Sequence, residues 1–368
     1  MLTPEPGTAL NDLDTPCLVV DLDLVDKNIK SIMQRVKKLG ITIRPHLKTA
    51  KSPGFARKLI EEGAMGICVA KLSEAEIMME AGVDDILITT EIVGEPKVRR
   101  LLSLATRNPK LRIVIDSEKG AEQIGERIKD LDHPLLVLVD INVGQDRCGV
   151  ENKEEALAIA KTIQSIKNLK IIGMQGYEGH LQMLADETER KRLCHQSMNK
   201  LVEAAEYLRA NGFDIQTVST GGTGTFEYCA EVKGVTEVQA GSFIFMDLSY
   251  TNSGRKGFEQ ALHVLSTVIS KPMSNRAVVD AGMKSLSTDS GNAKPHAKHG
   301  SFSYRPAGDE HGILEPNNGD KLNVEIGDKI LFVPSHIDTT INLHEFYYCM
   351  RNEKLESVRR ISTRGKVQ

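Results

Sequence analysis

A lysine and a glycine-rich segment have the clearest chemical potential in this sequence. Lys48 lies in RPHLKTAK, where Arg44, His46 and Lys51 crowd the same short stretch. Neighbouring cations lower the pKa of a lysine and favour its neutral, nucleophilic form. The glycine-rich segment, residues 219–225, reads STGGTGT. Glycine lets backbone amides approach an anion closely and threonine hydroxyls add donors, so we expect a phosphate-binding turn there.

An amine facing a phosphate-binding turn suits pyridoxal 5′-phosphate. The aldehyde of that cofactor forms a Schiff base with a lysine, and its phosphate needs a cradle of amides and hydroxyls. Two other interpretations stay open: Lys48 is a solvated surface lysine, and the glycines only make a tight turn. The candidate cofactor contacts besides Lys48 are Thr220, Gly222, Thr223, Gly241 and Ser242.

Three further residues in two short segments could take part in the same chemistry. Arg147, in NVGQDRCGV, could hold the phenolate of such a cofactor, or it could form an ion pair at the rim. Tyr177 and His180, in GYEGH, are candidates for proton transfer. The alternative for both is an ordinary hydrogen bond within a loop.

A candidate metal site lies near the C-terminus, in PSHIDTTINLHEF. His336 and Asp338 are two residues apart on a predicted strand, so their side chains emerge on one face and can converge on one ion. A neutral imidazole with a hard carboxylate suits Mn²⁺ or Mg²⁺, with Zn²⁺ also possible. The alternative is a structural histidine. Glu310 and His311, in DEHGIL, are possible neighbours or a possible base, or else part of an exposed loop.

Short β-branched runs alternate with helical patterns through the first two thirds of the chain, and this alternation is typical of a parallel sheet. Eight such runs within about 215 residues favour a (β/α)8 barrel over a doubly wound open sheet. Lys48, Arg147, Tyr177, His180, the glycine-rich segment and Gly241–Ser242 follow these runs, at the end of a barrel where active sites lie. The expected strands are residues 41–46, 66–70, 85–90, 111–116, 135–140, 170–175, 217–220 and 237–241.

The sequence predicts a second domain rich in β-strands. One strand-like run, residues 17–22, precedes the first helix and is surplus to the barrel. After residue 255 the sequence changes to β runs separated by Gly, Asn and Asp clusters. We therefore expect a barrel over residues 23–255 and a β-rich domain from residues 1–22 and 256–368, which the surplus strand joins.

Composition excludes several classes of protein. In 368 residues, 47 Lys and Arg balance 50 Asp and Glu, a net charge of −3 that gives no reason to expect nucleic-acid binding. The longest strongly apolar run, Leu135 to Val139, is far shorter than the roughly 20 residues of a membrane span. The N-terminus lacks the pattern of a secretory signal. Six cysteines without a CxxC pair indicate free thiols in the cytosol.

Nine segments together resemble the D-threonine aldolase and D-serine dehydratase group of fold-type III pyridoxal-phosphate enzymes. They follow in the same order from about residue 12 to residue 349. They are DTPCLVVDLDLVDKNI, RPHLKTAKSP, DRCGV, GYEGH, the glycine turn, QAGSF, DAGMKSLSTDSG, DEHGIL and PSHIDTTINLH.

The resemblance implies a barrel like that of alanine racemase, a β domain and a homodimer. It places Lys48 at the Schiff-base position, Arg147 and Tyr177 at cofactor-contacting or active-site positions, and His336 with Asp338 as the metal pair. Dehydratases of the group tend to have cysteine where this chain has Asp338. Ile337 and the pair Thr339–Thr340 depart modestly from the family pattern, which affects substrate preference more than cofactor identity.

The activity implied by the resemblance is retro-aldol cleavage of D-threonine-like substrates to glycine and an aldehyde. His180, His311 or a metal-bound water would remove the proton of the β-hydroxyl group. One alternative is a dehydratase acting on D-serine or D-3-hydroxyaspartate, with Lys48 abstracting the α-proton. A second is a pyridoxal-phosphate homeostasis protein without turnover, but such proteins resemble a lone barrel, so the β domain counts against it.

Overall fold

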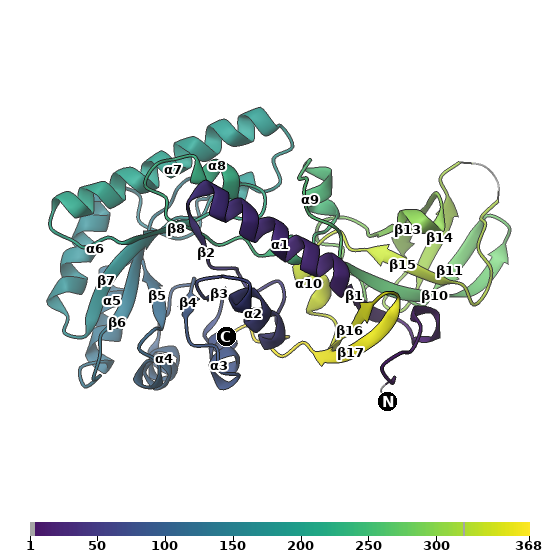
Figure 1. Cartoon of the computed structure of the whole chain (residues 1–368), viewed down its shortest axis with the longest axis horizontal. Helices are drawn as coiled ribbons and strands as arrows, with labels where there is room; N and C mark the ends of the chain where they lie inside the picture. The colour runs from purple at the N-terminus through teal and green to yellow at the C-terminus, as the bar shows by residue number, and fades with distance from the viewer. Residues whose placement is uncertain (1–3, 319–320) are drawn as a thin grey trace. The chain divides into compact units, whose positions relative to one another are not determined.

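The computed structural model describes residues 4–318 and 321–368 and divides into two compact units (Figure 1). One unit comprises the chain up to residue 31 and residues 242–365, and the other comprises residues 32–241 and 366–368. Among the described residues, no helix is long and apolar enough to cross a membrane.

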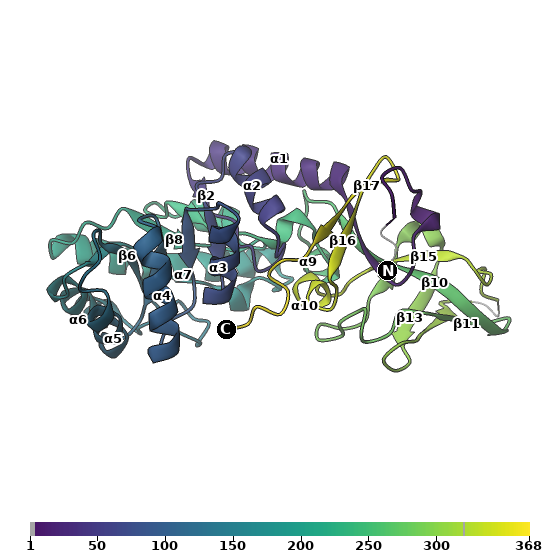
Figure 2. The ribbon, with the colours of Figure 1, turned by 90° about the horizontal axis from the view of Figure 1, so that it is seen from below.

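The second unit is a parallel sheet of eight strands with helices between consecutive strands (Figure 2). Each strand runs parallel to its neighbours, in the order β2-β9-β8-β7-β6-β5-β4-β3. The strands are β2 (Thr42–Ile43), β3 (Ile67–Val69), β4 (Ile86–Ile88), β5 (Arg112–Ile115), β6 (Leu135–Asp140), β7 (Leu169–Gln175), β8 (Thr217–Thr220) and β9 (Glu237–Val238). All eight predicted strands are present, because each β-branched run is short, apolar and flanked by breakers.

Most of the connecting helices begin at residues that favour a helix start. Pro lies in the first turn of α2 and α4, and Asn152 accepts a hydrogen bond from the amide of Glu155 at the start of α6. Asp186 does the same for Glu189 in α7. The helices are α1 (Leu22–Leu39), α2 (Pro53–Glu61), α3 (Leu72–Glu80), α4 (Glu95–Arg107), α5 (Glu118–Arg127), α6 (Lys153–Ser165), α7 (Glu187–Ala210) and α8 (Phe226–Ala230).

The two end strands of this sheet, β2 and β3, are joined just beyond β2. His46 and Cys68 form a parallel bridge, in which the amide of Leu47 donates to Cys68 O at 2.8 Å and the amide of Cys68 to Pro45 O at 2.9 Å. The sheet therefore closes on itself through this bridge. The predicted (β/α)8 class is confirmed and the open doubly wound sheet is excluded.

The first unit is the predicted β-rich domain. The surplus strand β1 (Cys17–Asp21) lies inside its sheet, antiparallel to β10 (Leu262–Met273) and parallel to β16 (Phe346–Arg351). The sheet order is β13-β14-β11-β10-β1-β16-β17, with β15 paired to β10 and β12. The other strands are β11 (Arg276–Val279), β12 (Lys294–Pro295), β13 (Phe302–Pro306), β14 (Gly312–Pro316), β15 (Lys329–Val333) and β17 (Lys354–Arg360).

The predicted domain boundaries fell at residues 22–23 and 255–256, whereas the compact units meet at 31–32 and 241–242. Helix α1 runs without a break through residue 23, and its N-terminal half groups with the β-rich unit. The side-chain amide of Asn28 donates to Ile244 O at 3.2 Å and to Glu259 O at 2.8 Å. These buried hydrogen bonds tie the start of α1 to the chain that enters β10.

Candidate active site

Lys48 follows β2 at the C-terminal end of the barrel. It lies in a turn that the amide of Lys51 closes by donating to Leu47 O at 2.8 Å. The Lys48 side chain is half-buried, and among the described residues its ammonium has no hydrogen-bonding or ion-pair partner. The nearby Lys51 differs, because its ammonium lies 3.9 Å from the Glu74 carboxylate. Of the two lysines, only Lys48 has an amine without a described partner, and we call it the uncommitted amine.

His46 supplies a neutral imidazole beside Lys48. Its Nδ1 accepts from the Lys48 amide at 3.3 Å and its Nε2 lies 3.0 Å from Thr89 Oγ1, so the proton belongs on Nε2. Burial holds the pKa of His46 well below its usual value, and the charges of Lys48, Lys51 and Arg147 add to this. The charge of Arg147, in the loop after β6, thus reaches His46.

Hydrogen bonds within the loop after β6 fix the conformation of the segment that carries Arg147. Asn142 organises it: its Oδ1 accepts from the amides of Gly144 at 2.9 Å and Asp146 at 3.1 Å, and its Nδ2 donates to Asp146 Oδ1. Gly149 packs so closely that a Cβ there would lie 2.5 Å from Asn142 N. The Arg147 guanidinium carbon lies 5.7 Å from the centre of the Tyr177 ring, a cation–π distance.

His180 lies beside the same loop. It belongs to a short 3-10 turn, Gly179–Leu181, that follows β7, and its side chain is exposed. A Cβ built on Gly144 would lie 3.3 Å from His180 Nε2. The structure thus brings Arg147, Tyr177 and His180 together at the barrel end that carries Lys48.

The glycine turn after β8 surrounds a buried carboxylate that the sequence analysis passed over. Glu178 is 0 % exposed and accepts from Thr220 Oγ1 at 2.9 Å, from the Gly221 amide at 3.3 Å and from Thr225 Oγ1 at 2.5 Å. Gln182 Nε2 donates to it from the other side at 3.0 Å. The one available signal was its position within GYEGH, between two residues singled out for chemistry.

The glycines of this turn serve close packing against Gln182. A Cβ on Gly222 would lie 2.4 Å from Gln182 Oε1, and one on Gly224 would lie 2.5 Å from Gln182 O. The amide of Gly222 donates to Thr225 Oγ1 and that of Gly224 to Gln182 Oε1, so protein acceptors already use both amides. Thr223 is also buried.

Gly241 and Ser242 lie just beyond the end of β9. A Cβ on Gly241 would lie 2.4 Å from His46 O, so only glycine fits where the ends of β9 and β2 meet. Ser242 is buried and is the first residue of the short 3-10 helix Ser242–Ile244. Its carbonyl oxygen accepts a hydrogen bond from the Met246 amide at 2.8 Å.

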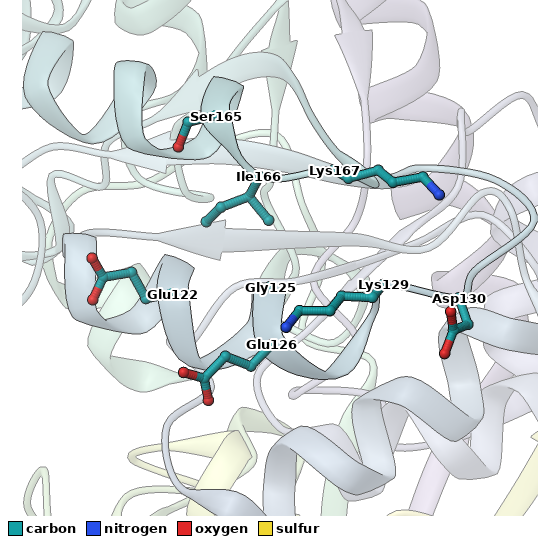
Figure 3. A pocket seen from close by; sticks show the side chains of 8 residues that line it. All are labelled: Glu122, Gly125, Glu126, Lys129, Asp130, Ser165, Ile166 and Lys167. Atoms are coloured by element: carbon teal, nitrogen blue, oxygen red, sulfur yellow. The ribbon is translucent and has the colours of Figure 1, made fainter.

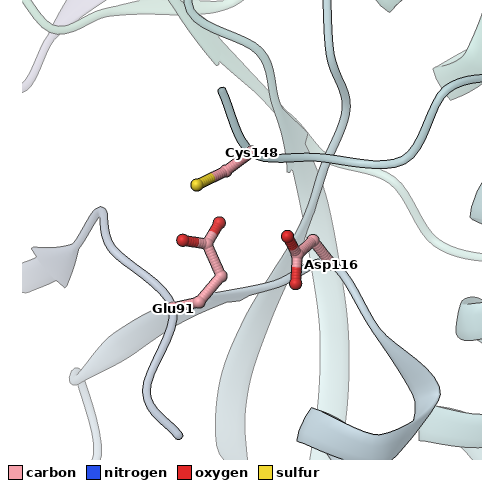
Figure 4. Close-up of side chains that lie close together, drawn as sticks. All are labelled: Glu91, Asp116 and Cys148. Atoms are coloured by element: carbon pink, nitrogen blue, oxygen red, sulfur yellow. The ribbon is translucent and has the colours of Figure 1, made fainter. Parts of the chain in front are cut away.

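An acidic cluster that the sequence analysis did not find lies at the same end of the barrel (Figure 4). Glu91 follows β4, Asp116 follows β5 and Cys148 lies in the loop after β6; ligand atoms of all three lie within 4.8 Å of one another. Burial, reinforced by Glu91, raises the pKa of the Cys148 thiol to about 11. Burial raises the pKa of the adjacent Asp140 to about 8, although a hydrogen bond from Gln175 opposes this.

The metal candidates do not lie on a strand, contrary to the sequence prediction. Strand β15 ends at Val333, and Ile337 begins the short helix α10 (Ile337–Ile341). His336 is the extended residue before this helix and Asp338 lies in its first turn. Pro334 has no amide hydrogen, and the amide of Ile337 donates to Asp247 Oδ2 at 3.1 Å, so a helix start replaces a continued strand.

Both candidates nevertheless have features of metal ligands. His336 Nδ1 lies 2.6 Å from Asp289 Oδ2, which leaves Nε2 as the free lone pair, as in carboxylate–histidine–metal arrangements. Asp338 Oδ1 is buried and has no hydrogen-bond partner among the described residues. These two observations fit a divalent cation.

Asp289 and Asp247 support this pair and were not identified from the sequence. Burial acts against ionisation of Asp289, but hydrogen bonds from Ser287, His336 and Thr339 hold its pKa well below the usual value. Burial raises the pKa of Asp247 to about 6. Asp289 lies within DAGMKSLSTDSG, one of the segments that carry the family resemblance, and that was the available signal.

His311 is exposed in the hairpin between β13 and β14, where its carbonyl accepts from the Ala307 amide at 2.8 Å. In the part of the chain that the structure describes, no cluster of three metal-ligating groups includes His311. Its catalytic role stays a prediction.

A groove of about 600 Å³ lies elsewhere on the barrel (Figure 3). It is formed at the ends of α5 and α6, next to the starts of β6 and β7, whereas active sites of barrels lie at the opposite end. Its lining residues are Glu122, Gly125, Glu126, Lys129, Asp130, Ser165, Ile166 and Lys167.

Comparison with known proteins agrees with this geometry. The family model described as alanine racemase, N-terminal domain, matches residues 20–249, and the putative serine dehydratase domain matches residues 261–350. The chain belongs to the alanine racemase-like family that includes D-threonine aldolase. It is 35% identical over 364 residues to D-threonine aldolase from Arthrobacter, covering 98% of this chain and 95% of that protein.

Other relatives of this family agree. The chain is 33% identical to 3-hydroxy-D-aspartate aldolase from Paracoccus denitrificans, with 98% of this chain and 95% of that protein covered. The crystal structure of D-threonine aldolase from Filomicrobium marinum matches with a TM-score of 0.95 at 33% identity, covering 99% of this chain and all of that one (100%). Members of this family have the fold-type III architecture, for which pyridoxal phosphate is the expected cofactor.

The residues at the barrel end fit that cofactor. An uncommitted amine with cations at Lys51 and Arg147 matches an anionic aldehyde. Thr49 Oγ1, next to Lys48, is buried and has no hydrogen-bond partner within the described residues, so a further donor is available.

Proposed function

We propose that the protein cleaves D-configured β-hydroxy-α-amino acids, such as D-threonine, to glycine and an aldehyde, with pyridoxal 5′-phosphate and a divalent cation. The observation that carries the proposal is the uncommitted Lys48 amine at the C-terminal end of β2, in a chain 35% identical over nearly its full length to a D-threonine aldolase. Bound pyridoxal phosphate supplies an electron sink for the bond that breaks.

The residues of the barrel end would hold the cofactor. Lys48 would bind its aldehyde carbon, and Arg147, held over the Tyr177 ring, would bind its phenolic oxygen. Its phosphate would bind at the turn that contains Thr220, Gly222 and Thr223 and at the segment Gly241–Ser242. His46, beside Lys48, stays neutral because burial holds its pKa well below the usual value.

His336 and Asp338 would hold the cation, which lowers the pKa of the substrate β-hydroxyl group when bound. One imidazole and one carboxylate favour Mn²⁺ or Mg²⁺, with Zn²⁺ also compatible. Asp289 would keep His336 in the tautomer that presents Nε2. His180 and His311 are the candidates for the group that accepts the hydroxyl proton.

A second function on the same scaffold is dehydration of D-serine or D-3-hydroxyaspartate to ammonia and a keto acid. The match of residues 261–350 to a putative serine dehydratase domain favours this alternative. In that reaction Lys48 would remove the α-proton. A carboxylate at position 338, where dehydratases of this group tend to have a thiolate, supports the aldolase.

The experiment is an assay of products. Purified protein with added pyridoxal phosphate and MnCl₂ is incubated separately with D-threonine, D-3-hydroxyaspartate, D-serine and, as a control, L-threonine. We expect glycine with acetaldehyde from D-threonine and no turnover of the L isomer. A keto acid and ammonia without glycine would show a dehydratase, and no product from any substrate would return the chain to the binding-protein alternative.

The same proposal includes a homodimer in the cytoplasm. All six cysteines are free thiols, including Cys194 and Cys229, whose Sγ atoms lie 3.4 Å apart without a disulfide, as suits a reducing compartment. Light scattering on the eluting protein tests the dimer, and fractionation of the source cells tests the compartment.

A further inference from the structure

Within the described residues, Glu178 is a buried carboxylate without a cationic partner. It is 0 % exposed, and in the described part of the chain no lysine, arginine or histidine pairs with it. A buried carboxylate without a cation is costly unless several donors offset the loss of water. The donors here are the hydroxyls of Thr220 and Thr225, the Gly221 amide and the Gln182 side-chain amide, at 2.5 to 3.3 Å, and the Cys229 thiol at 3.6 Å. The Thr220 hydroxyl shares its hydrogen with Gly176 O, which lies at 2.6 Å.

Three of these five donors belong to the glycine turn or its entry from β8. The Glu178 carboxylate therefore holds the glycine turn at Thr220, Gly221 and Thr225, that is, near both of its ends. Hydrogen bonds to a charged acceptor are about twice as strong as neutral ones, so this contact set fixes the backbone of the turn firmly.

Gln182 connects Glu178 to two residues of the turn, Gly224 and Thr225. Its Nε2 donates to both Glu178 and Thr225 Oγ1, and its Oε1 accepts from the Gly224 amide at 2.8 Å. Thr225 Oγ1 in turn accepts from the Gly222 amide at 3.2 Å. Glu178 thus fixes, directly or through one neighbour, the backbone positions of Gly221, Gly222 and Gly224, whose amides donate to protein acceptors.

We propose that Glu178 is a positioning residue that shapes the glycine turn for the 5′-phosphate of the cofactor, and so determines the preference for pyridoxal phosphate over pyridoxal. This rests on the proposed function. Both ligands offer the same aldehyde to Lys48, and only one carries the group that reaches the turn. The ratio of their dissociation constants therefore isolates the contribution of the turn.

Charge alone predicts the opposite result. A carboxylate near a bound phosphate would repel it, so if Glu178 acted only through its charge, removing that charge would tighten pyridoxal phosphate binding. If Glu178 acts by positioning, removing its hydrogen bonds weakens binding of the phosphate. The direction of the change distinguishes the two.

The test compares E178Q and T225V with the wild-type protein. E178Q removes the charge and one acceptor at constant size, and T225V removes the hydroxyl that connects Glu178 to Gly222. E237Q is the matched control, because Glu237 is another buried carboxylate of the barrel, bonded by Arg44 Nε at 3.0 Å and by Ser219 Oγ at 2.7 Å. Cofactor-free full-length protein is titrated with pyridoxal phosphate and with pyridoxal, and visible absorbance gives both dissociation constants.

We expect each test variant to lose about tenfold of the wild-type preference for the phosphorylated ligand, the effect of one or two charge-assisted hydrogen bonds. Pyridoxal affinity should change little. E237Q should lower the melting temperature and keep the ratio. Circular dichroism establishes that each variant is folded, and if one is not, the other decides.

A ratio that stays unchanged or rises in the folded variants overturns the positioning role, even when their melting temperatures fall. That outcome is distinct from a failure of the proposed function. If wild-type protein binds neither ligand, the cofactor assignment itself is wrong. If wild-type protein prefers the phosphorylated ligand and E178Q retains that preference, only the role of Glu178 is wrong.

Discussion

At the scale of single residues, the contrast between Lys48 and Lys51 carries the cofactor assignment. Both lie in the turn after β2, but the Lys51 ammonium is 3.9 Å from Glu74, whereas that of Lys48 has no partner among the described residues. Proximity to a barrel end would fit either lysine. The free amine distinguishes them.

Replacing Lys48 with alanine should therefore abolish the visible absorbance of lysine-bound cofactor. Turnover should fall by more than about 10³-fold, since the covalent attachment is lost. Absorbance spectra after addition of pyridoxal phosphate measure the first effect. The matched Lys51→Ala variant should keep the band, and a band that survives in Lys48→Ala but disappears in Lys51→Ala would reverse the assignment.

Asp338 and Asp289 should differ in their contribution to cation binding. Asp338→Ala removes a proposed ligand and should abolish both Mn²⁺ binding and turnover. Asp289→Ala removes only the partner of His336 Nδ1 and should weaken Mn²⁺ by about 10- to 100-fold. Calorimetric titration with Mn²⁺ measures both, with Glu345→Ala as an exposed carboxylate control in the same unit.

Cofactor absorbance should be nearly unchanged in these variants and after treatment with EDTA. Added Mn²⁺ should restore the EDTA-treated wild-type protein but not Asp338→Ala. Full activity after removal of divalent ions would assign His336 and Asp338 a structural role.

At the scale of elements, the junction between β2 and β9 depends on a glycine. The Gly241→Ala variant places a Cβ 2.4 Å from His46 O, a backbone atom that cannot move without shifting the strand end before Lys48. We expect a loss of about 1–3 kcal/mol in the free energy of unfolding, together with weaker cofactor binding. Urea denaturation and the absorbance titration measure the two effects.

Gly54→Ala is the control for this prediction. Its Cβ would lie 3.6 Å from Ser52 Oγ, an ordinary contact, in the first turn of α2. Alanine there should be neutral or stabilising by up to about 1 kcal/mol. Equal stability of both alanine variants would show that the junction tolerates a side chain.

At the scale of the whole molecule, buried neutral histidines should make the fold sensitive to acid. Burial lowers the pKa of His263 in β10 to about 3, and the neighbouring charges of His296, Lys298 and His299 add to this. Its ring lies 5.2 Å from that of His296, and its Nε2 is buried with no partner in the described chain. Between about pH 6.5 and pH 3 the unfolded chain binds a proton that the folded chain does not.

Stability should therefore fall as the pH falls through this window. His263→Leu removes the proton uptake of the unfolded state, so its loss of stability between pH 6.5 and pH 4 should be smaller than that of the wild type by about 3 kcal/mol. Urea denaturation at several pH values measures the two curves. Parallel curves would mean that His263 is protonated equally in both states.

Local signals were sufficient for the barrel and for the places of its end residues. Each strand is a short β-branched run next to a helical pattern, and the order of such units places Lys48, Arg147, Tyr177 and the glycine turn at one end. The surplus strand was also recognisable, because it preceded the first helix of the barrel. These features depend only on residues close together in the chain.

Contacts between distant residues decided the rest. Glu91, Asp116 and Cys148 follow three different strands and meet only because those strands are neighbours in the sheet. His336 meets Asp289 across 47 residues, and position 336 precedes a helix because the carboxylate of Asp247 accepts the amide of Ile337. The hydrophobic periodicity of a segment does not indicate which distant residues its side chains will contact. Pattern along the chain thus specifies which elements form and which ends they expose, while hydrogen bonds between remote side chains specify which charges are paired, buried or left available for chemistry.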